Sequence, residues 1–205
     1  LKIMDLAPAS GQPMIDHQLG LSLVFNGAIY NYPELRTELQ ALGYQFHSDG
    51  DTEVLLKGYH AWGEQLLPKL NGMFAFAIWE RDRERLFLAR DRLGIKPLYL
   101  TQDGARLRFA STLPALLQGG GIDTGLDPVA LNHYLNFHAV VPAPRTLLRG
   151  VEKLPPASWL RLDLNGNREQ QCWWQLEFGP HRDEITLELA CLLYTSPSPR
   201  DKRQS

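Results

Sequence analysis

Cysteine is scarce in this chain of 205 residues, which contains only two, Cys172 and Cys191. Two cysteines exclude a disulfide framework, so we expect a fold held by its hydrophobic core in a reducing, cytoplasmic compartment. No run approaches the ~18 consecutive apolar residues that a membrane span needs. The first residues, Leu1 to Met4, show no basic region followed by an apolar run, so the sequence indicates neither a signal peptide nor a membrane partner.

Net charge is also nearly absent. Lys and Arg number 21 against 23 Asp and Glu, which leaves a formal charge of −2. A near-neutral chain offers no electrostatic basis for binding nucleic acid. The hydrophobic fraction of 44% and the charged fraction of 21% are ordinary for a globular protein and exclude a disordered or collagen-like chain.

Metal and phosphate motifs are missing as well. His60, His133 and His138 lack zinc-ligand spacing, and no Cys-x-x-Cys occurs, so we expect packed or surface histidines and no metal. The glycines at 119–121 are not followed by Lys-Ser/Thr and so do not form a phosphate-binding loop.

The apolar periodicity nevertheless predicts a mixture of helices and strands. Residues 7–20 contain Pro and Gly and are expected to form a loop, and the next strand is expected to stop at the turn dipeptide Asn26-Gly27. Helix 33–43 is expected to bury Leu35, Leu39 and Leu42. Helices are expected at 33–43, 52–61, 63–70, 112–118 and 127–136, and strands at 1–6, 21–25, 73–79 (central), 85–90, 97–101, 106–110, 158–163 and 169–174.

Four short motifs follow one another in the first half of the chain: Phe25–Asn31, Gly50–Glu53, Asn71–Ala77 and Ala89–Tyr99. In this order they closely resemble the class II glutamine amidotransferase domain of the glutamine-dependent asparagine synthetase family. Residues 127–175 resemble the entry into the ATP-dependent synthetase domain of that family.

The resemblance implies an α+β fold, a four-layer αββα N-terminal-nucleophile-hydrolase sandwich, truncated at its N-terminus and followed by the start of a second α/β domain. The triple glycine marks a candidate boundary. We therefore expect a glutaminase domain over 1–122 and a linker with the start of the synthetase domain over 123–190. Residues 191–205 resemble the translation of a sequencing adapter, and we expect them to be a non-native tail.

The resemblance also implies site residues. Asn26 and Gly27 match the oxyanion hole, in which an Asn side-chain amide and a Gly N–H stabilise the negative oxygen formed during amide cleavage. Asp51 matches the carboxylate that holds the α-ammonium group of glutamine, a charge-assisted contact. The glutamine-binding set implied is Leu1, Ile3, Asp5, Asn26, Gly27, Ala28 and Asp51. Other interpretations are a plain turn at Asn26-Gly27, a helix cap or first-turn residue at Asp51, and an ordinary core strand at 1–5.

Another motif, formed by Arg90, Asp91 and Gly94, carries no chemistry that we can derive. We expect a structural role, in which Asp91 forms an ion pair with Arg90 or Arg92 and Gly94 adopts an unusual backbone angle.

The nucleophile of the family, an N-terminal cysteine, is not found beside these motifs, because residue 1 is Leu and Cys172 lies far downstream. We therefore expect a piece of a larger enzyme that lacks glutaminase activity as it stands. The resemblance implies that the larger enzyme uses ATP and Mg²⁺, bound outside this chain, to join ammonia from L-glutamine to a carboxylate of aspartate or a related compound. A homodimer is a further expectation.

Other readings remain open at this point. They are an N-acetylglutaminylglutamine amidotransferase, a glutaminase serving sugar-phosphate or purine synthesis, a non-catalytic glutamine-binding module and a purely structural scaffold.

Overall fold

The computed structural model describes residues 11–104 and 106–177. The contacts group the chain up to Gln175 into one compact unit, and every helix and strand named below lies in it. The strand expected at 1–6 and the tail expected at 191–205 lie outside the described residues. Among the described helices, none is long and apolar enough to cross a membrane.

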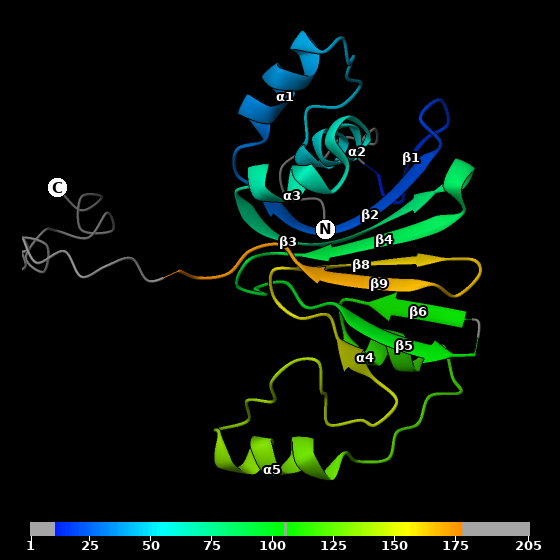
Figure 1. Ribbon diagram of the computed structural model, residues 1–205, viewed down its shortest axis with the longest axis vertical. Helices are drawn as coiled ribbons and strands as arrows, with labels where there is room; N and C mark the ends of the chain where they lie inside the picture. The colour runs from blue at the N-terminus through cyan, green and yellow to red at the C-terminus, as the bar shows by residue number, and fades with distance from the viewer. Residues whose placement is uncertain (1–10, 105, 178–205) are drawn as a thin grey trace, which may run out of the picture. The chain divides into compact units, whose positions relative to one another are not determined.

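The larger of two sheets is antiparallel, with six strands in the order β1-β2-β3-β4-β8-β9 (Figure 1). Its middle strands are apolar on both faces, as expected for a sheet covered on both sides. The strands are β1 (Met14–Asp16), β2 (Leu21–Ile29), β3 (Gly72–Glu80), β4 (Arg85–Arg90), β8 (Ser158–Asp163) and β9 (Arg168–Cys172).

Helices cover one face of this sheet (Figure 1). Large side chains that alternate along the strands, among them Phe25, Phe76 and Phe87, pack with Leu39 and Leu55 of the helices into the main core. The segments of this layer are α1 (Tyr32–Ala41), α2 (Asp51–Trp62), η2 (Gly63–Gln65) and α3 (Leu66–Lys69), and the short helix η3 (Arg81–Arg83) joins β3 to β4.

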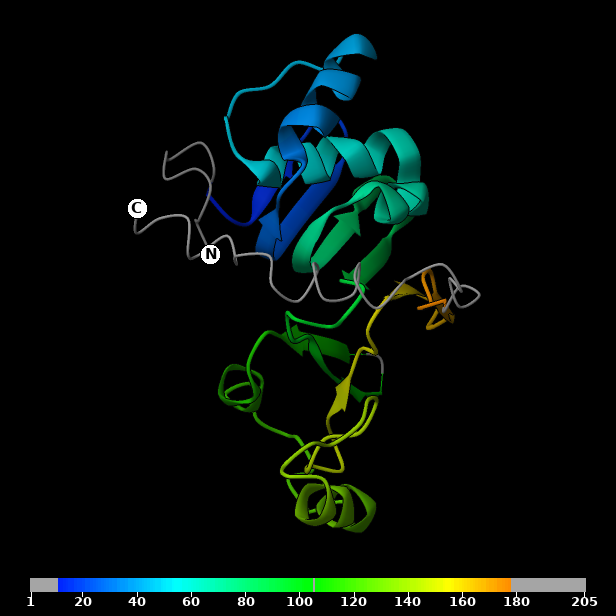
Figure 2. The same cartoon turned by 90° about the vertical axis from the view of Figure 1, so that its left-hand side faces the viewer.

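A three-stranded sheet in the order β6-β5-β7 packs on the other face. Ala75 and Ala77 of β3 face the smaller sheet. They form a second apolar cluster with Leu98 and Leu100. Helix α4 lies against this smaller sheet, and Figure 2 shows the same succession of layers from the side. The segments are β5 (Tyr99–Asp103), β6 (Arg106–Ala110), β7 (Glu152–Lys153), α4 (Leu113–Leu117) and α5 (Pro128–Asn136).

These layers confirm the expected four-layer αββα sandwich. The central position of β3 and the helix at 127–136 are also confirmed, the latter with Asp127 accepting hydrogen bonds from the N–H groups of Val129 and Ala130. Residues 7–20 are not a plain loop, because Met14–Asp16 pairs with Leu21–Leu23.

Two further expectations are wrong. The strand does not stop at Asn26-Gly27 but continues to Ile29, since β3 pairs with it along its whole length and outweighs the local turn preference. Leu42 is not part of the buried helix face: α1 ends at Ala41, and Leu42 is 60% exposed, whereas Leu35 and Leu39 are buried.

The boundary expected at residue 122 does not coincide with the end of either sheet. Strand β8 pairs with β4, β9 extends the same sheet, and β7 pairs with β5. Residues 152–172 therefore complete both sheets of the sandwich. No part of the described chain shows the start of a second domain; that expectation stays a prediction.

Asp91 is structural, as expected, but its partners are different. Its carboxylate accepts hydrogen bonds from the backbone N–H groups of Phe74, Leu93, Ile95 and Lys96, at 2.9–3.2 Å. The expected ion pair with Arg90 or Arg92 is not present among the contacts of the described residues.

Arg90 is held separately. Its guanidinium donates to the carbonyl oxygens of Gly94, Lys96 and Leu154. Gly94 has a φ of +65°, as its expected role required. Arg90 and Asp91 thus bind the 93–96 turn from both sides through backbone groups.

Replacing Asp91 with alanine is therefore expected to be strongly destabilising. The substitution leaves the buried N–H of Phe74 and the part-buried N–H groups of the 93–96 turn without an acceptor. Bonds to a charged acceptor are the strong ones, so we expect a loss of about 3 kcal/mol in the free energy of unfolding. Urea denaturation measures this. The exposed Asp103→Ala substitution is the control, expected to stay within about 0.5 kcal/mol of the unsubstituted protein; similar losses for both would contradict the assignment.

Candidate active site

The outer edge of β2 is the centre of the candidate site. On one side β2 pairs with β3 over all nine residues, while on the other side β1 covers only Leu21–Leu23. Alternate residues of an antiparallel strand direct their N–H groups to the same edge. The N–H groups of Phe25, Gly27 and Ile29 therefore face the side where β1 has ended.

Side chains occupy two of these three positions. The N–H of Phe25 donates to Gln12 Oε1 at 2.7 Å, and the N–H of Ile29 donates to Asp51 Oδ2 at 2.9 Å. The N–H of Gly27 lies between them, and no described residue accepts a hydrogen bond from it. Within the described part of the chain, one backbone donor is thus left open at this strand edge.

Gly27 is required here by packing against β3. A Cβ atom on this residue would lie 2.1 Å from the carbonyl oxygen of Met73 and 2.8 Å from Phe74 Cα. No side chain fits at that distance, so the close approach of β2 and β3 depends on glycine.

Asn26, the preceding residue, faces the smaller sheet, because side chains alternate between the faces of a strand. It lines a cavity of about 320 Å³ whose other walls are mainly apolar, including Val24, Ala77, Leu98 and Phe109. Asn26 Oδ1 is buried and has no hydrogen-bond partner among the described residues. Asn26 thus presents its side chain to the cavity and Gly27 presents its N–H to the strand edge, and the oxyanion role expected of the two residues stays a prediction.

Asp51 reaches the same strand from the helical layer. It is the first residue of α2 and is 5% exposed. Burial raises the pKa of its carboxyl, and the hydrogen bond from Ile29 offsets this only in part. Its carboxyl is bonded to Ile29, two residues along β2 from Gly27, and a buried carboxylate at this place is suited to a cationic partner.

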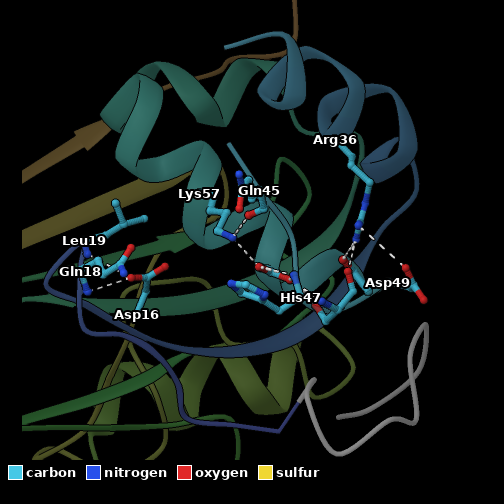
Figure 3. Close-up of polar contacts among 11 residues, drawn as sticks. Asp16, Gln18, Leu19, Arg36, Gln45, His47, Asp49 and Lys57 are labelled. Carbon is cyan, nitrogen blue, oxygen red and sulfur yellow. Dashed lines mark hydrogen bonds and ion pairs between the residues drawn. The ribbon is translucent and has the colours of Figure 1, made fainter. Parts of the chain in front are cut away.

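The loop before Asp51 is held by charged side chains. Arg36 donates to the carbonyl oxygens of Ser48 and Gly50, and Lys57 donates to the carbonyl oxygen of Gln45 (Figure 3). Glu53 accepts from Lys57 and from the N–H groups of His47 and Ser48. This loop therefore leads into α2 in one defined conformation.

These contacts shift the pKa of the Glu53 carboxyl. Burial opposes its ionisation, but the hydrogen bonds from Lys57, Ser48 and His47 outweigh that effect and lower the pKa of its carboxyl. The sequence pattern did not point to the pair of Glu53 and Lys57 as functional residues. Its spacing of four residues is a helix-pair signal, but such pairs usually lie in solvent, and here both side chains are at most 7% exposed.

The remaining expected residues contribute less. Ala28 is buried beside Gly27 and offers no polar side chain. Leu1, Ile3 and Asp5 lie outside the described residues. Gln12 was missed, because a glutamine before a proline in an expected loop carries no functional signal.

The histidines and cysteines show no catalytic grouping within residues 11–104 and 106–177. His60 is hydrogen-bonded to Tyr44, and His133 stacks on Phe137. No set of three His, Cys, Asp or Glu side chains in these ranges could hold a metal ion. Cys172 is exposed on β9.

The layers define a four-layer αββα sandwich in which β2 presents part of its edge beyond the end of β1. A family model described as a glutamine amidotransferase domain matches residues 1–174, and the chain belongs to this family.

Within this family, the chain is similar in sequence to glutamine-hydrolysing asparagine synthetases. Glutamine-hydrolysing asparagine synthetase 1 of Bacillus subtilis (strain 168) is 39% identical over 199 residues, which cover 96% of this chain and 31% of that protein. Glutamine-hydrolysing asparagine synthetase 3 of the same organism is 36% identical over 164 residues, which cover 80% and 26%. The chain thus spans less than a third of the length of these relatives.

A solved structure supports the fold. Glutamine phosphoribosylpyrophosphate amidotransferase from B. subtilis, complexed with ADP and GMP, aligns with a TM-score of 0.57 at 20% sequence identity, over 83% of this chain and 33% of that one.

Because the Asp51 carboxyl is buried, we expect Asp51→Asn to leave the protein at least as stable at pH 7. Asparagine keeps an oxygen acceptor for the Ile29 N–H but carries no charge that burial disfavours. The folded state holds the Asp51 proton more tightly than the unfolded chain, whose aspartate pKa is about 3.9. The stability of the unsubstituted protein relative to the variant should therefore decrease as pH rises from about 4 through the raised folded-state pKa.

Urea unfolding at several pH values between 4 and 7 measures this difference. Asp16→Asn is the matched control, since Asp16 accepts N–H groups in the exposed β1–β2 turn (Figure 3). A variant at position 51 that is less stable by the same amount at every pH would contradict the expectation.

Proposed function

We propose that this domain binds L-glutamine and stabilises the oxyanion that forms when its side-chain amide is cleaved. The Gly27 N–H and the Asn26 side-chain amide are the oxyanion donors, and Asp51 holds the α-ammonium group. The observation that carries the proposal is the open N–H of Gly27. Asp51 lies on the same strand edge, bonded to Ile29, and the neighbouring Asn26 lines the cavity.

The chemistry explains why these groups suit the reaction. Attack on an amide carbon turns the carbonyl oxygen into an oxyanion, and donors already in place stabilise this charge without rearrangement. The Gly27 N–H is such a donor, because β2 is paired with β3 along all nine of its residues.

The attacking group of this reaction is not supplied by Cys172. That residue lies on β9, four strands from β2 in the sheet order. At ~4.8 Å per strand this separation is about 19 Å, well beyond bonding distance. The N-terminal cysteine that the family resemblance implies remains the expected nucleophile of the larger enzyme.

For the larger enzyme we propose an amide-forming ligase, in line with the names of the longer relatives. Ammonia from L-glutamine would be joined to a carboxylate of aspartate or a related compound that ATP has activated, with ATP and Mg²⁺ bound by residues outside this chain. A homodimer and a cytoplasmic location stay predictions.

Calorimetric titration of the purified chain with L-glutamine tests the proposed site. We expect saturable binding of one equivalent and none of D-glutamine. Asp51→Asn should weaken binding about 10-fold or more, because a hydrogen bond between charged groups contributes roughly 1.5–3 kcal/mol. Asp16→Asn, the control variant, should bind as the unsubstituted chain does.

Two results would contradict the proposal: no binding of L-glutamine by the unsubstituted, folded chain, or equal affinity of the Asp51→Asn variant. Binding that stays intact while the full-length enzyme fails to release ammonia would identify a non-catalytic glutamine-binding module instead.

A further inference from the structure

The side-chain amide of Gln12 has one end in use and one end free. Its Oε1 accepts the N–H of Phe25 at 2.7 Å. An amide nitrogen cannot accept this bond, so the orientation of the amide is determined. Nε2 is therefore the other end; it is buried and has no hydrogen-bond partner among the described residues.

This free donor shares a cavity with a free acceptor. Gln12 and Asn26 both line the cavity between the two sheets, and Asn26 Oδ1 is likewise buried and unpartnered. Leaving a buried polar atom unpaired costs about 1–3 kcal/mol. One buried donor and one buried acceptor in a mainly apolar cavity therefore form a site prepared for a ligand that supplies the complementary pair.

The position agrees with the proposed reaction. Phe25 and Gly27 are two residues apart on the same edge of β2, a separation of about 7 Å at ~3.4 Å per residue. The Gln12 amide, which is bonded to Phe25, is therefore next to the place where the Gly27 N–H would meet a carbonyl oxygen.

We infer that Gln12 contacts the side-chain amide of L-glutamine and contributes to its recognition as a primary carboxamide. Gln12 Nε2 donates to the carbonyl oxygen beside the Gly27 N–H, and Asn26 Oδ1 accepts from the NH₂ group. A glutamate side chain offers no N–H to Asn26, so this pair favours glutamine. The inference rests on the proposed function and adds a specificity-determining residue to it.

A purely structural role makes a different prediction. If Gln12 only continues the hydrogen-bond ladder beyond β1, the bond that its Oε1 accepts from Phe25 is its whole role. Glutamate at position 12 would then accept this bond equally well. Gln12→Glu is nearly isosteric, retains an oxygen for the Phe25 N–H and removes both N–H donors. The matched control is Gln18→Glu, in the exposed turn between β1 and β2.

The test compares two ligands by titration calorimetry. L-glutamine carries the carboxamide, and L-norvaline has a methyl group in its place. We expect Gln12→Glu to weaken L-glutamine binding about 10-fold or more and to change L-norvaline binding less than about 2-fold. Gln18→Glu should alter neither affinity.

Equal affinity of Gln12→Glu for L-glutamine, or the same loss for both ligands, would overturn the inference. Failure of the unsubstituted chain to bind L-glutamine would instead overturn the proposed function, so the two failures are distinguishable. If Gln12→Glu does not fold, nitrogen-15 NMR of the unsubstituted chain decides: L-glutamine should slow hydrogen exchange of the Gln12 side-chain amide and L-norvaline should not. Identical exchange with both ligands would contradict the inference.

Discussion

The register of β2 against β3 is the constraint on which both the core and the candidate site depend. Nine consecutive residues are paired, and glycine at position 27 lets the two backbones approach closely. With this register Phe25 faces the helical layer and Asn26 faces the smaller sheet. A slip of one residue would exchange the two faces and turn the Gly27 N–H into the ladder. Packing of the core and presentation of the oxyanion donor are therefore consequences of one alignment.

An open strand edge inside a protein is unfavourable, since unpaired N–H groups are costly when water is excluded. Here Gln12 and Asp51 accept the N–H groups on either side of Gly27, and among the described residues the Gly27 N–H is the one backbone donor that they leave for a ligand on this edge. Asp51 does this as a buried acid, and burial disfavours its charge. The contact that we propose for the substrate ammonium therefore comes at the expense of stability, a common relation between function and stability at active sites.

The two sheets also explain why the family model extends to residue 174, beyond the boundary at residue 122 that the three glycines indicated. Strand β8 pairs with β4 and buries Trp159 and Leu160 in the two core clusters. The family model ends at residue 174, and the compact unit ends at Gln175. The amidotransferase domain therefore needs strands that come after the triple glycine and after α5.

Much of the molecule follows from local sequence. Short apolar runs indicated β3, β4 and β8, and Asp127-Pro128 indicated the start of α5, because hydrophobic pattern and capping act within a few residues. The motif order indicated Asn26, Gly27 and Asp51 as the candidate site residues. Tertiary structure alone decided what these residues do. Asp51 meets Ile29 across 22 residues, Gln12 meets Phe25 across 13, and Asp91 meets Phe74 across 17. Which N–H groups of β2 remain free depends on where its neighbour β1 ends and on which distant side chains reach the edge of β2. No local sequence pattern contains that information.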